Sequence, residues 1–307
     1  MSLLDHYYQN EKNITKLLKN KEIKIHSQEF RSILNQLLID YKIDNSGNLL
    51  RLIDFKKYFE EYDISYLEKK AKKLGIEFFF SKKEFTLTTL DACASDNMQP
   101  TVHLADYQIE ARGQYARVWK SAYRQQIQTT IGPFSVKSNE NSNMLMIKIA
   151  YHFMCILGNR CPNLNLQYKW PNDIYLNGNK VAGFLLTLKG DKYFISIGLN
   201  LTYQDPSCCI GSIFTKAEKK LREDLLLEYL IDYFENISIE KMTLFLNKNS
   251  FFSDGEEILY DDYNSKTACY YRGINNEFAC CIQHHLTDQS LTKIYAGSLN
   301  KIKKNHN

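Results

Sequence analysis

The chain has 307 residues, enough for two or three domains that each bury a hydrophobic core. Hydrophobic residues make up 44% and charged residues 24%, as in ordinary soluble globular proteins, and a net charge of +4 does not by itself indicate nucleic-acid binding. The first residues lack the pattern of a secretory signal and no run of about eighteen apolar residues occurs, so we expect a cytoplasmic protein with reduced cysteines.

The first sixty residues predict a small module of their own. Apolar residues recur at three- and four-residue steps from Asn13 to Leu38, which predicts two short helices, and Ser27 suits the N-cap of the second. Residues 43–52 are expected to form two short strands around a tight turn. Helix, turn, helix and hairpin is the layout of a winged helix-turn-helix, and the alternative is a small helical domain with a solvated lysine face. If the module reads DNA, the side chains placed to reach base edges are Gln28, Arg31 and Asn35.

A second domain is predicted to begin near residue 60. Residues 65–74 suit a lysine-rich amphipathic helix ended by Gly75, and an apolar strand is expected at 76–80. The side chains expected to face inward from this helix are Leu67, Ala71 and Leu74.

A loop with two arginines follows a strand predicted at 102–107. Gln108 stands at the end of this strand, and Trp119 closes the loop. The whole stretch reads Ala105-Asp106-Tyr107-Gln108-Ile109-Glu110-Ala111-Arg112-Gly113-Gln114-Tyr115-Ala116-Arg117-Val118-Trp119.

The most informative stretch is Lys169-Trp170-Pro171-Asn172-Asp173 and the ten residues after it. Pro171 and Asn172 turn the chain between two strands, and Asn177-Gly178 predicts a hairpin whose return strand begins near Lys180. The hairpin would bring Lys169, Asp173 and Lys180 together. Two cations around one carboxylate suit an anionic substrate with metal-bound phosphates, whereas the alternative is an ordinary hairpin with solvated lysines.

The remaining elements alternate between helices and strands. Helices are predicted at 142–157 and 221–237, and a strand pair is predicted at 184–188 and 194–197. The short strands expected near the C-terminus lie at 268–271, 278–282 and 293–295.

Taken together, the stretches 105–119 and 169–173 resemble the biotin–protein ligase family. Its catalytic domain carries an alanine, two variable positions and a glutamine, then a loop of glycines and arginines closed by tryptophan, and later a Lys-Trp-Pro-Asn-Asp block. The resemblance implies an α+β fold with a mixed or antiparallel sheet, like the catalytic domain of class II aminoacyl-tRNA synthetases. It implies three domains: a winged-helix-like domain at 1–60, the biotin/lipoate ligase-like catalytic domain at 61–249 and an SH3-like barrel at 250–307.

The resemblance also implies a biotin site. Thr88-Thr89-Leu90 stands where the family has a Ser-Thr-Asn block that bonds the ureido head, and Ser95-Asp96-Asn97 is a rival alignment of that block. Because Leu90 replaces an amide, we expect altered recognition at this end. The implied biotin-binding residues are Thr88, Thr89, Leu90, Gln108, Arg112, Gln114, Lys180 and Gly183.

ATP and Mg²⁺ are implied beside biotin. The implied nucleotide-binding residues are Arg112, Gly113, Arg117, Lys169, Asn172, Asp173 and Asn200. The residues implied in catalysis are Lys180, Arg112 and Asp173, and no protein ligand set for a metal is predicted. The loop departs from the family because Ala111 and Ala116 replace glycines, while Gln114 and Tyr115 replace arginines.

The function that the resemblance implies is activation of biotin to biotinoyl-adenylate and transfer to a lysine of a biotin carboxyl carrier protein, the acetyl-CoA carboxylase subunit. The resemblance also implies binding to operator DNA and a ligand-induced homodimer. It implies no interaction with a membrane. Two alternatives stay open: a lipoate or octanoate ligase, and a catalytically impaired, biotin-responsive DNA regulator. Gln114 motivates the further hypothesis that the enzyme releases its reactive adenylate.

Overall fold

The computed structural model describes residues 41–43, 49–52, 59–95, 99–135, 142–202, 211–215, 218–233 and 237–302. The two helices predicted within the first forty residues, with Gln28, Arg31 and Asn35, lie outside these ranges, so the winged helix stays a prediction. The strand pair expected at 43–52 is present as β1 (Tyr41–Ile43) and β2 (Leu49–Leu52), which pair antiparallel.

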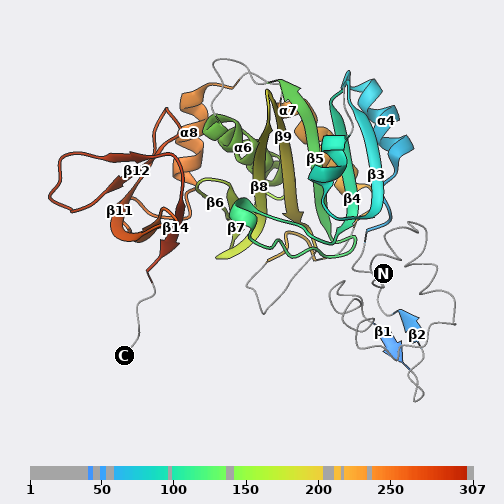
Figure 1. The fold of residues 1–307 in the computed structure, drawn as a ribbon, viewed down its shortest axis with the longest axis horizontal. Helices are drawn as coiled ribbons and strands as arrows, with labels where there is room; N and C mark the ends of the chain where they lie inside the picture. The colour runs from blue at the N-terminus through green and yellow to red at the C-terminus, as the bar shows by residue number, and fades with distance from the viewer. Residues whose placement is uncertain are drawn as a thin grey trace.

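A seven-stranded sheet forms the centre of the molecule (Figure 1). Only β3 and β4 pair in parallel, and the other neighbours pair antiparallel, which confirms the predicted mixed sheet of an α+β fold. Its strands, in spatial order, are β3 (Phe79–Thr86), β4 (Thr101–Gln108), β5 (Gln126–Ser135), β9 (Lys192–Asn200), β8 (Asn179–Lys189), β7 (Asp173–Leu176) and β6 (Leu166–Lys169).

Three helices cover one face of this sheet. Helix α6 (Ser142–Arg160) packs on β8, α4 (Ile64–Lys73) packs on β3, and both contact α7 (Leu221–Tyr233). The short α5 (Thr89–Ser95) contacts β4, β5 and β9, and the hydroxyl of Thr89 bonds Thr130, whose own hydroxyl bonds Ser196. Since successive residues of a strand face opposite sides, α5 lies on the face that Thr130 and Ser196 share, opposite the buried Ile195 and Ile197.

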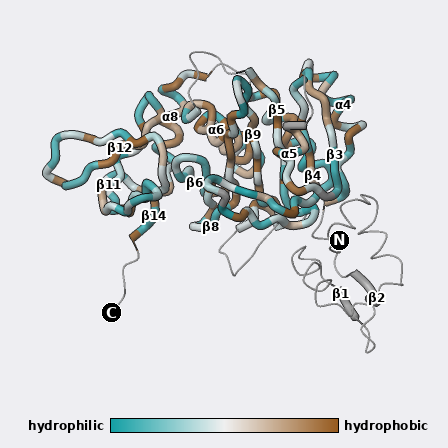
Figure 2. The backbone as a smooth tube through the Cα atoms, in the orientation of Figure 1, coloured by the Kyte–Doolittle hydropathy of each residue, from teal (hydrophilic) through white to brown (hydrophobic). Residues whose placement is uncertain are grey.

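A second sheet follows α8 (Ile239–Lys248) and is antiparallel throughout. The backbones of Tyr168 and Phe251 hydrogen-bond across the junction between the two sheets. Figure 2 shows hydrophobic residues gathered in the central sheet and hydrophilic ones at the outer turns of this second sheet. Its strands, in spatial order, are β13 (Thr292–Ile294), β12 (Cys280–Gln283), β11 (Lys266–Ile274), β10 (Glu257–Asp261) and β14 (Ser298–Lys301).

The structure corrects several sequence predictions. Leu74 is 45% exposed because the helix ends at Lys73, so its side chain does not face inward. The strand expected at 76–80 begins three residues later and continues to Thr86. The helix expected to reach residue 237 is described over Leu221–Tyr233, and Ile237 itself lies outside any helix. The strand β5 and the helix α8 were not predicted. No helix in the described ranges is both long and apolar enough to cross a bilayer.

Candidate active site

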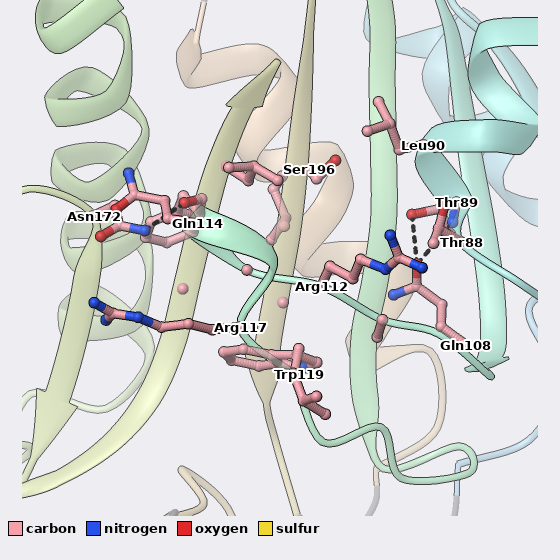
Figure 3. Close-up of a pocket in the computed structure, with 18 of the residues that line it drawn as sticks. Thr88, Thr89, Leu90, Gln108, Arg112, Gln114, Arg117, Trp119, Asn172 and Ser196 are labelled. Atoms are coloured by element: carbon pink, nitrogen blue, oxygen red, sulfur yellow. Dashed lines mark hydrogen bonds between the residues drawn. The ribbon is translucent and has the colours of Figure 1, made fainter. Parts of the chain in front are cut away.

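A cavity of about 330 Å³ lies between the central sheet and the loop 111–119 (Figure 3). It is lined by the start of α5, by the end of β4, by the loop, and by side chains of β7, β8 and β9. A volume in this range suits a small organic ligand.

The floor of the cavity is a row of residues that pair side by side across four strands. Asp173 pairs with Gly183, Gly183 with Gly198, and Gly198 with Gln128. The indole of Trp119 lies against the two glycines, and a Cβ at Gly198 would come within 2.7 Å of its Cε2 atom. A Cβ at Gly183 would come within 3.0 Å of its Cζ3 atom. Both positions therefore need glycine for the indole to approach the strands.

One end of the cavity holds a network of neutral hydrogen-bonding groups, with the charged side chains of Asp91 and Arg112 beside it. The Gln108 side-chain oxygen accepts hydrogen bonds from the backbone N–H of Thr89 at 2.7 Å and from its hydroxyl at 3.1 Å. The Gln108 amide nitrogen donates to the Gln128 oxygen, to which the Ser121 hydroxyl also donates. Such a network fixes the orientation of each amide, and it suits a neutral polar head group.

A chain of hydroxyls continues from this network towards β9. Thr89 and Thr130 share a hydrogen bond of 2.8 Å, and Thr130 and Ser196 share another of 2.8 Å. These residues come from three separate elements, and Thr89 and Ser196 line the cavity. Ser196 thereby adds a hydroxyl to the cavity wall.

The loop above the cavity is closed by its own backbone. The N–H of Trp119 donates to the carbonyl of Ala111, and the N–H of Gly113 donates to the carbonyl of Arg117. Arg112 pairs with Glu110 at 2.7 Å and is exposed at the rim. In Figure 3, Arg112 reaches towards the Gln108 end of the cavity, whereas Arg117 lies towards Asn172.

The other end of the cavity is charged. Lys180 Nζ lies 2.7 Å from Asp173 Oδ1, a close charge contact without the alignment of a hydrogen bond. Burial lowers the pKa of Lys169; the carboxylate of Asp173 opposes this shift, while the positive charges of Lys180 and Arg117 reinforce it. Three cations are thus close enough to destabilise one another, so a bound anion would relieve their repulsion.

All predicted site residues line this single cavity except Lys169 and Asn200. The Lys169 ammonium instead lies over the rings of Tyr175 and Phe251, 5.4 and 5.9 Å from their centroids. The Asn200 oxygen accepts a hydrogen bond of 2.7 Å from Gln126, so it stabilises the strands beneath the cavity. The roles of all these residues stay predictions. Of the rival block, Asp96 and Asn97 lie outside the described residues.

The sequence prediction did not assign several residues of the site. Trp119, Ser196 and Gly198 line the cavity, and Gln128 and Thr130 complete its polar network from the unpredicted strand β5. A signal for them exists. Every second residue from 126 to 130 is polar, as on one face of a half-polar strand. These residues are Gln126, Gln128 and Thr130, and they pair with Asn200, Gly198 and Ser196 respectively.

Comparisons with known proteins agree with this geometry. Residues 80–202 match the model of the Biotin/lipoate A/B protein ligase family. The human biotin–protein ligase is 27% identical over 186 residues, 54% of this chain and 26% of the human protein. Biotin–protein ligase 2 of Arabidopsis thaliana is 25% identical over 174 residues, 52% of this chain and 50% of that protein. The chain thus spans half or less of the length of these relatives.

The fold also matches a solved structure. A biotin protein ligase from Aquifex aeolicus, determined in complex with biotin and ATP, superimposes with a TM-score of 0.60 and 20% identity. The match covers 72% of this chain and 97% of that one, so the two proteins share their fold. Residues 80–202, which carry the cavity and its loop, are thus similar to the Biotin/lipoate A/B protein ligase family, and the relatives of this chain named above are biotin–protein ligases.

Proposed function

We propose that this protein is an ATP-dependent biotin–protein ligase that activates biotin as biotinoyl-adenylate and transfers it to a lysine of a biotin carboxyl carrier protein. The observation that carries the proposal is the polarity of the cavity. The neutral hydrogen-bonding groups around Gln108 suit a ureido head, and the cationic end around Lys180 suits a carboxylate and phosphates.

The floor of the cavity supports the same assignment. Gly183 and Gly198 leave the strands bare, so the Trp119 indole and a flat ligand can lie close to the backbone. The indole N–H of Trp119 has no hydrogen-bond partner among the described residues, so it is available to a ligand oxygen.

In the first step a carboxylate oxygen of biotin attacks the α-phosphorus of ATP, and the bond to the bridging oxygen breaks, which releases pyrophosphate. Negative charge develops on the phosphate oxygens, and Lys180, Arg112 and Arg117 are the cations that would stabilise it. In the second step the carrier lysine, as a free amine, attacks the acyl carbon and AMP leaves. Asp173 is our candidate to accept the proton that the amine loses.

Mg²⁺ fits this site as a companion of ATP. The described residues contain no cluster of three or more potential protein ligands for a metal, whereas Asp173 and Asn172 place one carboxylate and one amide on the cavity wall. Mg²⁺ commonly binds through one or two carboxylates and the phosphates of its substrate. When bound, it would neutralise phosphate charge.

We propose the same domain division that the resemblance implies, with residues 61–249 as the catalytic domain and 250–307 as an SH3-like barrel. The antiparallel sheet β10 to β14 supports the second assignment. DNA binding by residues 1–60 and a ligand-induced homodimer stay predictions, because most of that region lies outside the described residues.

The proposal predicts that Lys180→Ala lowers biotin-dependent ATP–pyrophosphate exchange by about 100-fold or more, because one cation at the reacting phosphate is lost. The measurement is exchange of labelled pyrophosphate with biotin as the acid. Lys189→Ala is the matched control, since Lys189 is an exposed lysine at the end of the same strand; its exchange rate should equal that of the unmodified protein.

Two results would contradict the proposal. Exchange that requires lipoate or octanoate instead of biotin would identify the alternative ligase of the same family. Biotin binding without any exchange in the unmodified protein would identify an impaired regulator, in keeping with Gln114 and Tyr115 at positions where the family has arginines.

A further outcome concerns the fate of the adenylate. Labelling of many lysines in a mixture of proteins, with normal exchange, would support release of the adenylate.

A further inference from the structure

A tyrosine of the second sheet reaches the loop of the candidate active site. Tyr263 lies in the turn between β10 and β11, and its ring centroid is 3.6 Å from that of Tyr115, with 36° between the ring planes. The guanidinium of Arg117 lies 5.6 Å from the centroid of the same Tyr263 ring. The contact therefore joins a loop that lines the cavity to a turn about 150 residues later in the sequence. None of the described residues of the second sheet lines the cavity.

Both tyrosines have an unfavourable backbone conformation. Tyr115, in the short 3₁₀ turn at Gln114–Ala116, has φ +57°, and Tyr263 has φ +74°. Residues other than glycine seldom adopt positive φ, and bulky ones need compensating interactions from their surroundings. Because these two strained residues hold their rings in close, tilted contact, we take the ring contact to be such an interaction.

The turn holds Tyr263 firmly. The N–H groups of Asn264 and Ser265 donate to Asp262 Oδ1, and the N–H of Tyr263 donates to Asp261 Oδ1. Hydrogen bonds from backbone to carboxylate lower the pKa of Asp262, which keeps this side chain charged and bonded at neutral pH. The Tyr263 ring is thus presented by a preformed turn.

The loop is less firmly held. Tyr115 is 58% exposed, and the backbone hydrogen bonds of Gly113, Arg117 and Trp119 close on the loop itself. The contact between Tyr115 and Tyr263 therefore attaches the loop to the second sheet.

We infer that Tyr263 is a positioning residue whose ring holds Tyr115 and Arg117, so that the loop of the cavity stays closed and its arginine stays in place. The consequence for catalysis rests on the proposed ligase function, whereas the attachment itself does not. The second sheet would thereby complete the active site without lining it.

The attachment is tested by trypsin cleavage after Arg112 and Arg117, with the loop peptides quantified by mass spectrometry. Tyr263→Ala should speed this cleavage about fivefold, the effect expected from loss of one aromatic pair in a locally opening segment. Tyr263→Phe retains the ring and should cleave at the original rate. Tyr295→Ala removes a half-exposed tyrosine that directly follows β13 and bonds Glu277, so it is the matched control and should also leave the rate unchanged.

Tyr115→Ala tests the other side of the contact and guards against a folding defect in one variant. It should speed cleavage about as much as Tyr263→Ala, and the double variant should add little, because both remove the same contact. Melting temperatures close to that of the unmodified protein would show that the opening is local. An unchanged cleavage rate in both single variants, or fully additive effects, would overturn the attachment.

The catalytic consequence has its own readout. With biotin and ATP, Tyr263→Ala should lower kcat/KM for pyrophosphate exchange about five- to tenfold, and Tyr263→Phe should restore it. Normal exchange in Tyr263→Ala with faster cleavage would overturn the positioning role. Absence of exchange in the unmodified protein would overturn the proposed function alone, because the cleavage result needs no substrate.

Discussion

At the scale of single residues, local spacing in the sequence predicts which charged groups of a hairpin lie together, but it does not predict the residues that pack around them. Lys180 and Asp173 lie in one hairpin, so their contact follows from local spacing, and the structure has it at 2.7 Å. The fit of Trp119 against Gly183 and Gly198 could not be predicted in this way. It depends on the register between β8 and β9 and on where a distant loop folds back.

This fit gives a prediction for Gly198→Ala. The new methyl group would lie 2.7 Å from Trp119 Cε2, so the indole must move away from the floor of the cavity. We expect pyrophosphate exchange to fall by about 10- to 100-fold, since small displacements in an active site have effects of that size. The fluorescence spectrum should change as well, because Trp119 is one of only two tryptophans in the chain and is the one that the new methyl group meets.

Gly158→Ala is the matched control for this substitution. Gly158 lies in α6, and a Cβ there would meet no atom within 4 Å. Alanine should leave exchange and fluorescence unchanged and stabilise the protein by about 0.5–1 kcal/mol, because it favours the helix. Unchanged tryptophan emission in Gly198→Ala would show that the indole does not depend on this glycine.

At the scale of elements, prediction succeeds where a hydrophobic period or a turn signal is clear. The hairpin of β7 and β8 and the helix α6 are confirmed for this reason. The strand β5 was missed although it lies between β4 and β9, because two of its fully buried side chains, Gln126 and Gln128, are polar. Their burial is possible only because partners from other strands satisfy them, and sequence periodicity carries no information about such partners.

Helix α6 carries a histidine that should make stability depend on pH. His152 is buried, and burial lowers its pKa from the usual 6.5 to about 4, with a smaller effect from the charge of Lys148. In the unfolded chain it is protonated below pH 6.5, whereas in the folded protein it stays neutral down to about pH 4. The stability is therefore complete above pH 6.5 and is lost as the pH falls towards 4.

We expect the free energy of unfolding to fall by about 2 kcal/mol between pH 7 and pH 5 through this residue. Urea unfolding at several pH values measures it. His152→Gln, which cannot be protonated, should flatten the acid side of the curve, and replacing the exposed His285 by glutamine should not. An equally steep acid side in His152→Gln would exclude His152 as its source.

At the scale of the whole molecule, the two sheets are one packed unit. A single hydrophobic core includes Trp170, which lies between β6 and β7, and Phe252, Ile258 and Tyr271 of the C-terminal region. The length of the sequence predicted two or three domains, but not how they join, because the joining contacts are made between residues far apart in the chain.

One of these contacts can be removed. Asn247 of α8 binds both backbone groups of Ile274 in β11: its amide donates to the carbonyl at 2.8 Å, and its oxygen accepts from the N–H at 2.8 Å. Ile274 is buried, so Asn247→Leu leaves two backbone groups without their partner, at a cost of about 1–2 kcal/mol. Exchange of the β11 and β12 amides should become about 5- to 30-fold faster, since a loss of that size shifts local opening by such a factor.

The increase in amide exchange, and the strands in which it occurs, show whether the hydrogen bonds of Asn247 attach the second sheet to α8. Asn247→Asp retains the acceptor and loses the donor, so its effect should be intermediate, while Lys248→Ala, the next exposed residue of α8, should have none. If the anchor also presents the turn of Tyr263 to the active-site loop, Asn247→Leu should speed trypsin cleavage after Arg117 as well. Faster amide exchange in the second sheet with unchanged loop cleavage would mean that the Tyr263 contact is independent of this anchor.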